Sequence, residues 1–147
     1  MITIFLDIDG VLATEYCSGL KNHELYSYPW DKECVDIFNH ITSQFECNIV
    51  LSSEWRIMYN NDLEMLDELF KHNGVTKSPN DVTPNLHRKR GLEIETYVKE
   101  HELTNFIILD DEELNIYPDQ HIECSLENGI KQLQQEIIAR CKSLTEA

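Results

Sequence analysis

The chain has 147 residues, of which 41% are hydrophobic and 27% are charged, a composition typical of a globular protein rather than a disordered one. This length matches one domain, so we expect residues 1–147 to fold as a single unit with its own core. The formal net charge of −15 repels polyanions at long range. It excludes extended binding to duplex nucleic acid and leaves small phosphorylated molecules or a nucleic-acid end as partners to consider.

The first half of the chain predicts two strands and one helix. Residues 2–8 form an apolar run typical of a buried strand. This run is too short to span a membrane, and no basic leader precedes it. We therefore expect a cytoplasmic protein without membrane contact. Residues 13–30 have no clear period and predict a loop or small flap. Asp31 can cap a helix, and residues 48–53 form a second strand-like run. The apolar positions of the helix follow three- and four-residue spacing: Cys34, Val35, Phe38, Ile41 and Phe45.

The second half of the chain continues this alternation. Residues 60–72 predict a helix that Asn73-Gly74 ends, residues 75–86 a weak edge strand and loop, and residues 90–101 another helix. Residues 106–109 form a third apolar run, and residues 121–124 predict a last strand. An amphipathic helix follows, with inward positions Ile130, Leu133, Ile137, Ile138 and Cys141. Alternating strands and helices predict an α/β fold in three layers, a Rossmann-like parallel sheet with helices on both faces.

The three strong apolar runs all end in polar side chains. These are Asp7 and Asp9, Ser52 and Ser53, and Asp110 and Asp111. In a parallel sheet the ends of these runs lie at one edge, where ligands bind. Asp7 and Asp9 point to the same side of the sheet, so their mutual repulsion requires a cation or a bound proton. Both are useful in phosphoryl chemistry, although Asp and Gly also form ordinary acidic turns.

Four short motifs occur in a characteristic order. They are Phe5-Leu6-Asp7-Ile8-Asp9-Gly10-Val11, Ile49-Val50-Leu51-Ser52-Ser53, Lys89-Arg90-Gly91 and Ile107-Ile108-Leu109-Asp110-Asp111. Through them the chain resembles the haloacid dehalogenase (HAD) superfamily of phosphohydrolases over essentially its whole length, which implies a HAD-like fold. Ser52-Ser53-Glu54-Trp55-Arg56 and Arg90-Gly91-x-Glu93-Ile94 are similar to a compact branch found in bacteria, phages and RNA-repair proteins. The insertions between motifs are short, so we expect a minimal cap and an open site.

The resemblance implies a role for the residues of the first two motifs. Asp7 attacks phosphorus to give an aspartyl-phosphate, and Asp9 protonates the leaving group and then activates water. Phosphatases of the superfamily keep an Asp at the position of Asp9, whereas its dehalogenases and transport ATPases do not. Ser52 or Ser53 hydrogen-bonds the phosphoryl group; we favour Ser52, with the backbone amide of Ser53 beside it. Gly10 lets the chain leave the strand sharply and is expected to lie against the substrate.

The basic residues come next. Lys89 or Arg90 is expected to offset the phosphoryl charge, and we favour Arg90 because it abuts the helix that carries Ile94 on its inner face. A solvated basic turn is the alternative. Arg56 is predicted to add a second positive contact to the phosphate, with a salt bridge to a surface carboxylate as its alternative.

A metal site is expected from the fourth motif. By the resemblance, Asp110 and Asp111 complete an oxygen-rich site with Asp7 and the backbone carbonyl of Asp9. The five cysteines are widely spaced and form no Cys-x-x-Cys pair, which argues against a disulfide frame or a structural zinc site. Oxygen ligands without a thiolate or imidazole cluster favour Mg²⁺.

We therefore expect a Mg²⁺-dependent phosphatase that forms an aspartyl-phosphate and acts on a nucleotide or on the terminal phosphate of a nucleic acid. The aromatic residues of the predicted flap either stack a base or pack the loop against the sheet: Tyr16, Tyr26, Tyr28 and Trp30. A phosphatase of sugar or cofactor phosphates is an alternative. A non-catalytic phosphate-binding module is an alternative of another class.

Overall fold

The computed structural model describes residues 1–20 and 25–146, and within them the chain forms a parallel sheet of five strands in the order β3-β2-β1-β4-β5. The strands are β1 (Ile2–Leu6), β2 (Cys47–Leu51), β3 (Asp81–Val82), β4 (Phe106–Asp110) and β5 (His121–Glu123). β1 lies at the centre and pairs with β2 on one side and β4 on the other. Its five residues are all buried, as the uninterrupted apolar run predicts for a central parallel strand.

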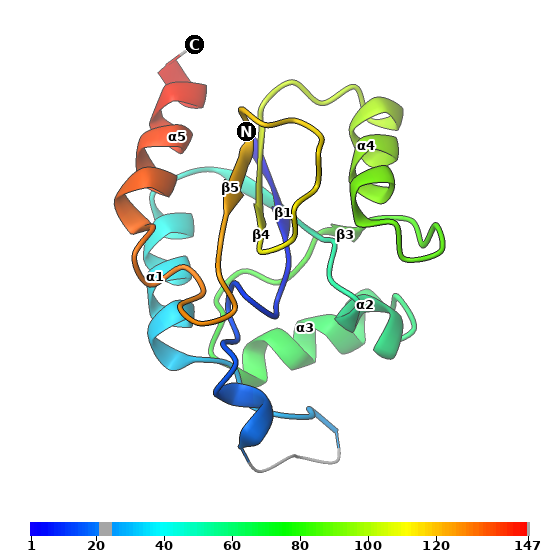
Figure 1. Cartoon of the computed structure of the whole chain (residues 1–147), viewed down its shortest axis with the longest axis vertical. Helices are drawn as coiled ribbons and strands as arrows, with labels where there is room; N and C mark the ends of the chain where they lie inside the picture. The colour runs from blue at the N-terminus through cyan, green and yellow to red at the C-terminus, as the bar shows by residue number, and fades with distance from the viewer. Residues whose placement is uncertain (21–24, 147) are drawn as a thin grey trace.

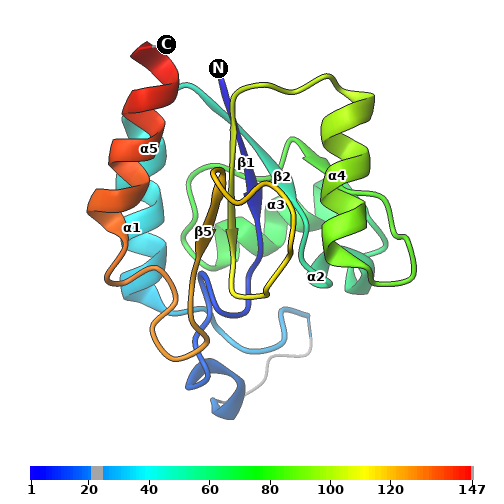
Figure 2. The ribbon, with the colours of Figure 1, turned by 45° about the horizontal axis from the view of Figure 1, so that its top comes forward.

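Helices cover both faces of this sheet (Figures 1 and 2). The chief helices are α1 (Lys32–Ser43), α3 (Leu63–His72), α4 (Arg90–Glu100) and α5 (Gln134–Glu146). α1, α3 and α5 share one apolar cluster with Ile4 and Leu6 of β1, whereas α4 packs on the other face against Phe5. The predicted three-layer α/β fold is therefore confirmed, and the alternation of side chains along β1 explains why each cluster contains every second residue.

Capping residues fix where the helices begin and end. The carboxylate of Asp31 accepts hydrogen bonds from the amides of Glu33 and Cys34, as the sequence predicts for the start of α1. Asp62 caps α3 in the same way, so this helix starts at Leu63 rather than near residue 60. α3 ends at His72, and Asn73 caps it as expected, with Gly74 in the left-handed region at a φ of +81°.

Two short helices and one boundary differ from the prediction. The 3-10 helix η1 (Cys17–Gly19) and the helix α2 (Trp55–Met58) were not predicted, because one-turn helices carry no apolar periodicity to detect. Ile130 and Leu133 are buried or partly buried as expected, but they lie in the turns before α5, which begins only at Gln134. No helix among the residues that the structure describes is long and apolar enough to cross a membrane.

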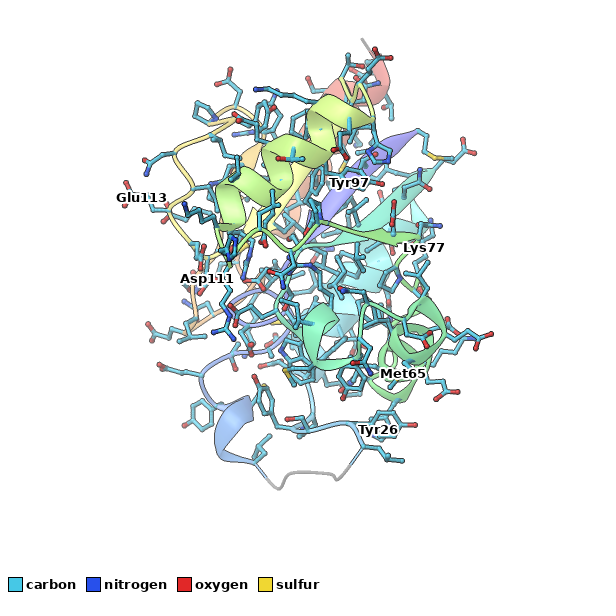
Figure 3. The ribbon with its side chains drawn as sticks, turned by 90° about the vertical axis from the view of Figure 1, so that its right-hand side faces the viewer. Tyr26, Met65, Lys77, Tyr97, Asp111 and Glu113 are labelled. Atoms are coloured by element: carbon cyan, nitrogen blue, oxygen red, sulfur yellow. The ribbon has the colours of Figure 1, made fainter. Side chains whose placement is uncertain are left out.

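The predicted flap packs against the body of the protein; its residues 21–24 lie outside the described residues. Tyr26 stacks on His72 of α3 at a ring separation of 3.9 Å, and Figure 3 shows it beside this helix. Trp30 makes an edge contact with Phe70 at 5.0 Å. Tyr16 is 80% exposed. Trp30 is 5% exposed, so for this residue the packing alternative is correct. Tyr26 is half-buried and packs one face of its ring on His72.

Candidate active site

The register of the sheet brings three motif residues into line. Leu6 of β1 stands opposite Leu51 of β2 and Leu109 of β4, so the next residue of each strand emerges at the same carboxyl edge. These next residues are Asp7, Ser52 and Asp110. Backbone bonds continue the pairing, because the Asp7 amide donates to Leu109 O at 3.1 Å and the Ser52 amide to Leu6 O at 3.0 Å. By the alternation of the strands, all three side chains lie on the face that α4 covers.

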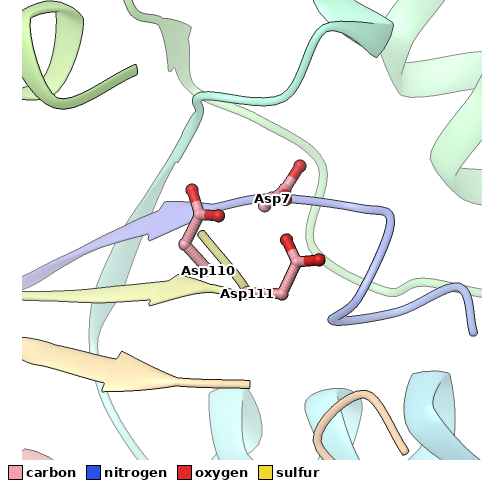
Figure 4. A group of neighbouring side chains, drawn as sticks. All are labelled: Asp7, Asp110 and Asp111. Atoms are coloured by element: carbon pink, nitrogen blue, oxygen red, sulfur yellow. The ribbon is translucent and has the colours of Figure 1, made fainter. Parts of the chain in front are cut away.

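Three carboxylates converge at this edge (Figure 4). Oxygen atoms of Asp7, Asp110 and Asp111 lie within 4.8 Å of one another. Asp7 and Asp110 are buried, at 4% and 0% exposure, and Asp111 is half-buried. Carboxylates that are this close and shielded from water raise one another's pKa unless a cation lies between them.

The pKa of Asp7 reflects its burial and its repulsion by the neighbouring carboxylates. Burial raises it well above the usual carboxyl range, the negative charge of Asp110 raises it further, and Arg90 opposes both. Burial also raises the pKa of Asp111. Three carboxylates face the single guanidinium of Arg90, which leaves an excess of negative charge. A cation bound by the three carboxylates would relieve that excess, and the donor set consists of the hard oxygen atoms that such ions prefer.

Arg90 is the basic residue that reaches the carboxylates. Its Nη1 lies 2.8 Å from Asp110 Oδ2 and 3.3 Å from Asp7 Oδ2, and its side chain is only 9% exposed. Lys89 precedes α4 as its capping residue and is exposed. The preference for Arg90 agrees with this geometry, and the alternative that Lys89 offsets the phosphoryl charge stays a prediction.

Gly10 has a spacing role. Its φ is +84°, and a Cβ atom there would lie 2.4 Å from Cγ of Asp111. Its amide donates to the carbonyl of Ala13 at 2.7 Å, so this donor is used within the loop. The absence of a side chain at Gly10 lets Asp111 approach the end of β1. The expected contact of Gly10 with substrate stays a prediction.

Arg56 also differs from its expected role. It is 0% exposed, and it forms an ion pair with Glu93 at 3.0 Å between side chains that are each 1% exposed. Its remaining donors bind backbone carbonyls, those of Thr83, Ser52, Ser53 and Pro84. Direct contact with a phosphate is therefore corrected to a structural role, and the ion-pair alternative is correct except that the partner is buried. Arg56 fixes the turn after β2 relative to α4.

The two serines differ in their surroundings. Ser52 is fully buried, and its Oγ has no hydrogen-bond partner among the residues that the structure describes. Ser53 Oγ accepts a hydrogen bond from the Trp55 amide at 3.2 Å. Ser53 belongs to the lining of a polar pocket of about 230 Å³, together with Asp7, Asp9, Glu54, Arg90, Asp111 and Glu112. Among the described residues, Trp30 Nε1 and Thr83 Oγ1 are buried without a partner in the same way, and Ser52 itself does not line the pocket.

Asp9 is held by two aromatic residues that sequence reasoning did not connect with it. The Tyr28 hydroxyl donates to Asp9 Oδ1, and the Trp55 indole N–H donates to Asp9 Oδ2 at 2.9 Å. Tyr28 is 19 residues from Asp9 along the chain and Trp55 is 46 residues away. The aromatic content of both segments was visible in the sequence, but no spacing rule relates residues so far apart.

The comparison with protein families agrees with this geometry. Residues 3–134 match the family model described as the HAD domain in Swiss Army Knife RNA repair proteins, so the chain belongs to this family. No curated protein and no solved structure matches the chain. A HAD domain indicates a hydrolase of the phosphohydrolase type, and the buried Asp cluster could bind the metal ion that such domains typically use.

Proposed function

From the membership of this chain in the HAD domain family we propose that it is a Mg²⁺-dependent phosphatase that acts through an aspartyl-phosphate on a nucleotide or a nucleic-acid terminal phosphate. The observation that carries the proposal is the position of Asp7. It lies at the end of the central strand, among carboxylates that suit a cation and within 3.3 Å of a guanidinium. A carboxylate held there can attack phosphorus while the positive groups stabilise the phosphoryl oxygens.

The first half-reaction forms the covalent intermediate. An oxygen of Asp7 attacks phosphorus, the bond between phosphorus and the ester oxygen breaks, and Asp9 gives its proton to the departing oxygen. Arg90 offsets negative charge on the transferred group from the α4 side. Ser52 and Ser53 would donate to a phosphoryl oxygen at the end of β2.

The second half-reaction releases phosphate. A water oxygen attacks phosphorus and its proton passes to the carboxylate of Asp9, while the bond from phosphorus to the Asp7 oxygen breaks. Asp7, Asp110, Asp111 and the backbone carbonyl of Asp9 would hold Mg²⁺, which when bound supplies positive charge to the phosphoryl oxygens. Asp9 thus ends the cycle protonated, as it began.

Two features favour a nucleic-acid end as the substrate. Arg88 and Lys89 are exposed beside Arg90, and Arg88 lies 3.7 Å from Glu54, which lines the pocket. They form a basic rim in an acidic chain, where a second phosphate of a strand can lie while the end phosphate enters. The family description, which refers to RNA repair proteins, supports the same class of substrate.

A small phosphorylated metabolite is the second candidate. The pocket measures about 230 Å³, a size that suits a compact phosphate ester better than a folded nucleic acid. A sugar or cofactor phosphate would need no contact with Arg88 or Lys89.

Phosphate release decides the reaction and the substrate. We would compare p-nitrophenyl phosphate, nucleoside monophosphates, sugar phosphates, and oligonucleotides phosphorylated at either end, with and without Mg²⁺. Asp7→Asn should abolish turnover, and Asp119→Asn, which changes an exposed Asp in the same way, should leave it unchanged. Activity of Asp7→Asn equal to wild type would overturn the mechanism. Equal rates for Arg88→Ala and wild type on oligonucleotides would overturn the proposal that the basic rim binds a second phosphate.

A further inference from the structure

Asp9 has both carboxylate oxygen atoms engaged by donors from two separate parts of the chain. Tyr28, from the segment before α1, donates to Oδ1, and Trp55, the first residue of α2, donates to Oδ2. A carboxylate with one donor on each oxygen has its plane fixed. Asp9 belongs to the pocket lining, so its orientation is set at the place where the ester oxygen would leave.

Trp55 is itself held firmly. It is 2% exposed and meets Tyr28 edge-on at 5.1 Å and Trp30 edge-on at 5.7 Å. Tyr59 lies parallel to it at 6.4 Å. Aromatic contacts of this kind stabilise beyond the area that they bury. The indole N–H therefore has little freedom to leave Asp9.

The segment that carries Tyr28 is tied down on both sides of it. The Tyr59 hydroxyl donates to Leu25 O at 2.8 Å, and the Trp30 amide donates to Asn73 Oδ1 at 2.9 Å. Tyr28 itself is half-buried between these two anchors. The two donors to Asp9 are thus parts of one aromatic assembly that spans the loop after β1, α2 and α3.

We propose that Tyr28 and Trp55 are positioning residues that orient Asp9 for proton transfer to the leaving group. The inference rests on the proposed function, because it assigns a role within that reaction. Proton transfer requires a defined oxygen within hydrogen-bond reach of the departing atom, and a misdirected carboxyl loses most of its contribution. The aromatic segment therefore acts on the chemistry through Asp9.

The test uses leaving groups of different quality. p-Nitrophenol leaves without help from an acid, whereas an alkyl alcohol needs a proton, so only the alkyl ester depends on a well-oriented Asp9. In Tyr28→Phe the ring and its contact with Trp55 stay and only the hydroxyl is removed. We expect kcat/KM to fall about tenfold or more for an alkyl monophosphate and less than about threefold for p-nitrophenyl phosphate.

Tyr59→Phe is the matched control, because it removes a hydroxyl that holds the same segment at Leu25 but does not touch Asp9. It should change kcat/KM for the two esters by the same factor. Thermal unfolding of both variants within a few degrees of wild type would show that the fold is kept.

An equal decrease for both esters in Tyr28→Phe, or no decrease, would overturn the inference and leave the proposed function standing. Absence of wild-type turnover on these esters and on the nucleotides and oligonucleotides compared above would overturn the proposed function and the inference with it.

Discussion

The buried ion pair between Arg56 and Glu93 gives the most direct test of how the site is built. Replacing Arg56 by Met keeps the length of the apolar stem but removes all the donors of the guanidinium. Glu93 is then left as a carboxylate with a 1% exposed side chain and no cationic partner at Arg56. Removing one member of a buried pair costs about 3–5 kcal/mol, because the remaining charge is uncompensated.

The carbonyl groups around Arg56 set a lower limit on the loss of unfolding free energy in Arg56→Met. The guanidinium binds the carbonyls of Ser52, Ser53, Thr83 and Pro84 at 2.8–3.1 Å. Each buried acceptor left without a donor costs about 1–3 kcal/mol. The loss of unfolding free energy in Arg56→Met should therefore be no smaller than about 3 kcal/mol. For a protein of this size, we expect the melting temperature to drop by roughly 6–20 °C.

Urea unfolding followed by circular dichroism measures the free energy of unfolding. Arg88→Met is the control, since Arg88 is 75% exposed and its 3.7 Å contact with Glu54 lies at the surface. It should cost less than about 1 kcal/mol. In Arg56→Met/Glu93→Met the loss should be smaller than in Arg56→Met, because the buried charge is gone, with coupling of about 0.5–3 kcal/mol. The structural role is refuted if Arg56→Met keeps its stability and instead raises KM for the phosphorylated substrate.

Three further predictions concern the carboxylates and their neighbours. Burial raises the pKa of Asp7, so without metal its contribution to stability is complete below the ordinary carboxyl pKa of about 4 and is lost as pH rises through the folded-state value. Mg²⁺ at 100 times its dissociation constant should then add about 2.7 kcal/mol, or about 5–11 °C, in thermal melts at pH 7.5 and little near pH 4; an equal shift at both pH values would contradict this. Gly10→Ala should cost about 1–2 kcal/mol in urea and weaken Mg²⁺ binding in calorimetry, since φ is +84° and Asp111 must move; unchanged affinity would show that Asp111 does not bind the ion. Arg90→Ala should lower kcat for p-nitrophenyl phosphate by about a hundredfold or more and Lys89→Ala by less than about twofold; the reverse order would exchange the roles that we assign to them.

The sequence alone predicted most of the fold. Uninterrupted apolar runs identify β1 and β4 because a central parallel strand is buried on both faces. Asp31 marks the start of α1 because its side chain can accept from amides two and three residues ahead. These signals are local, so they can be read without knowing what packs against them. One-turn helices such as α2 carry no such signal.

The sequence also predicted which carboxylates meet at the carboxyl edge of the sheet. Asp7 and Asp110 each stand at the end of an apolar run. Because β1 and β4 are neighbours in register, their side chains lie close together. Their charge and position are consequences of residue type and of the parallel sheet.

Only the tertiary structure decided which polar groups face one another. Lys89 and Arg90 have the same charge, and the packing of α4 on the sheet chooses between them. Arg56 looks like a phosphate ligand until its burial beside Glu93 is known. Asp9 gains its donors from residues 19 and 46 positions away, a relation that no local pattern contains. The physical reason is the same in each case: residue type sets what a side chain can bind, but burial and long-range contacts set which partner it meets.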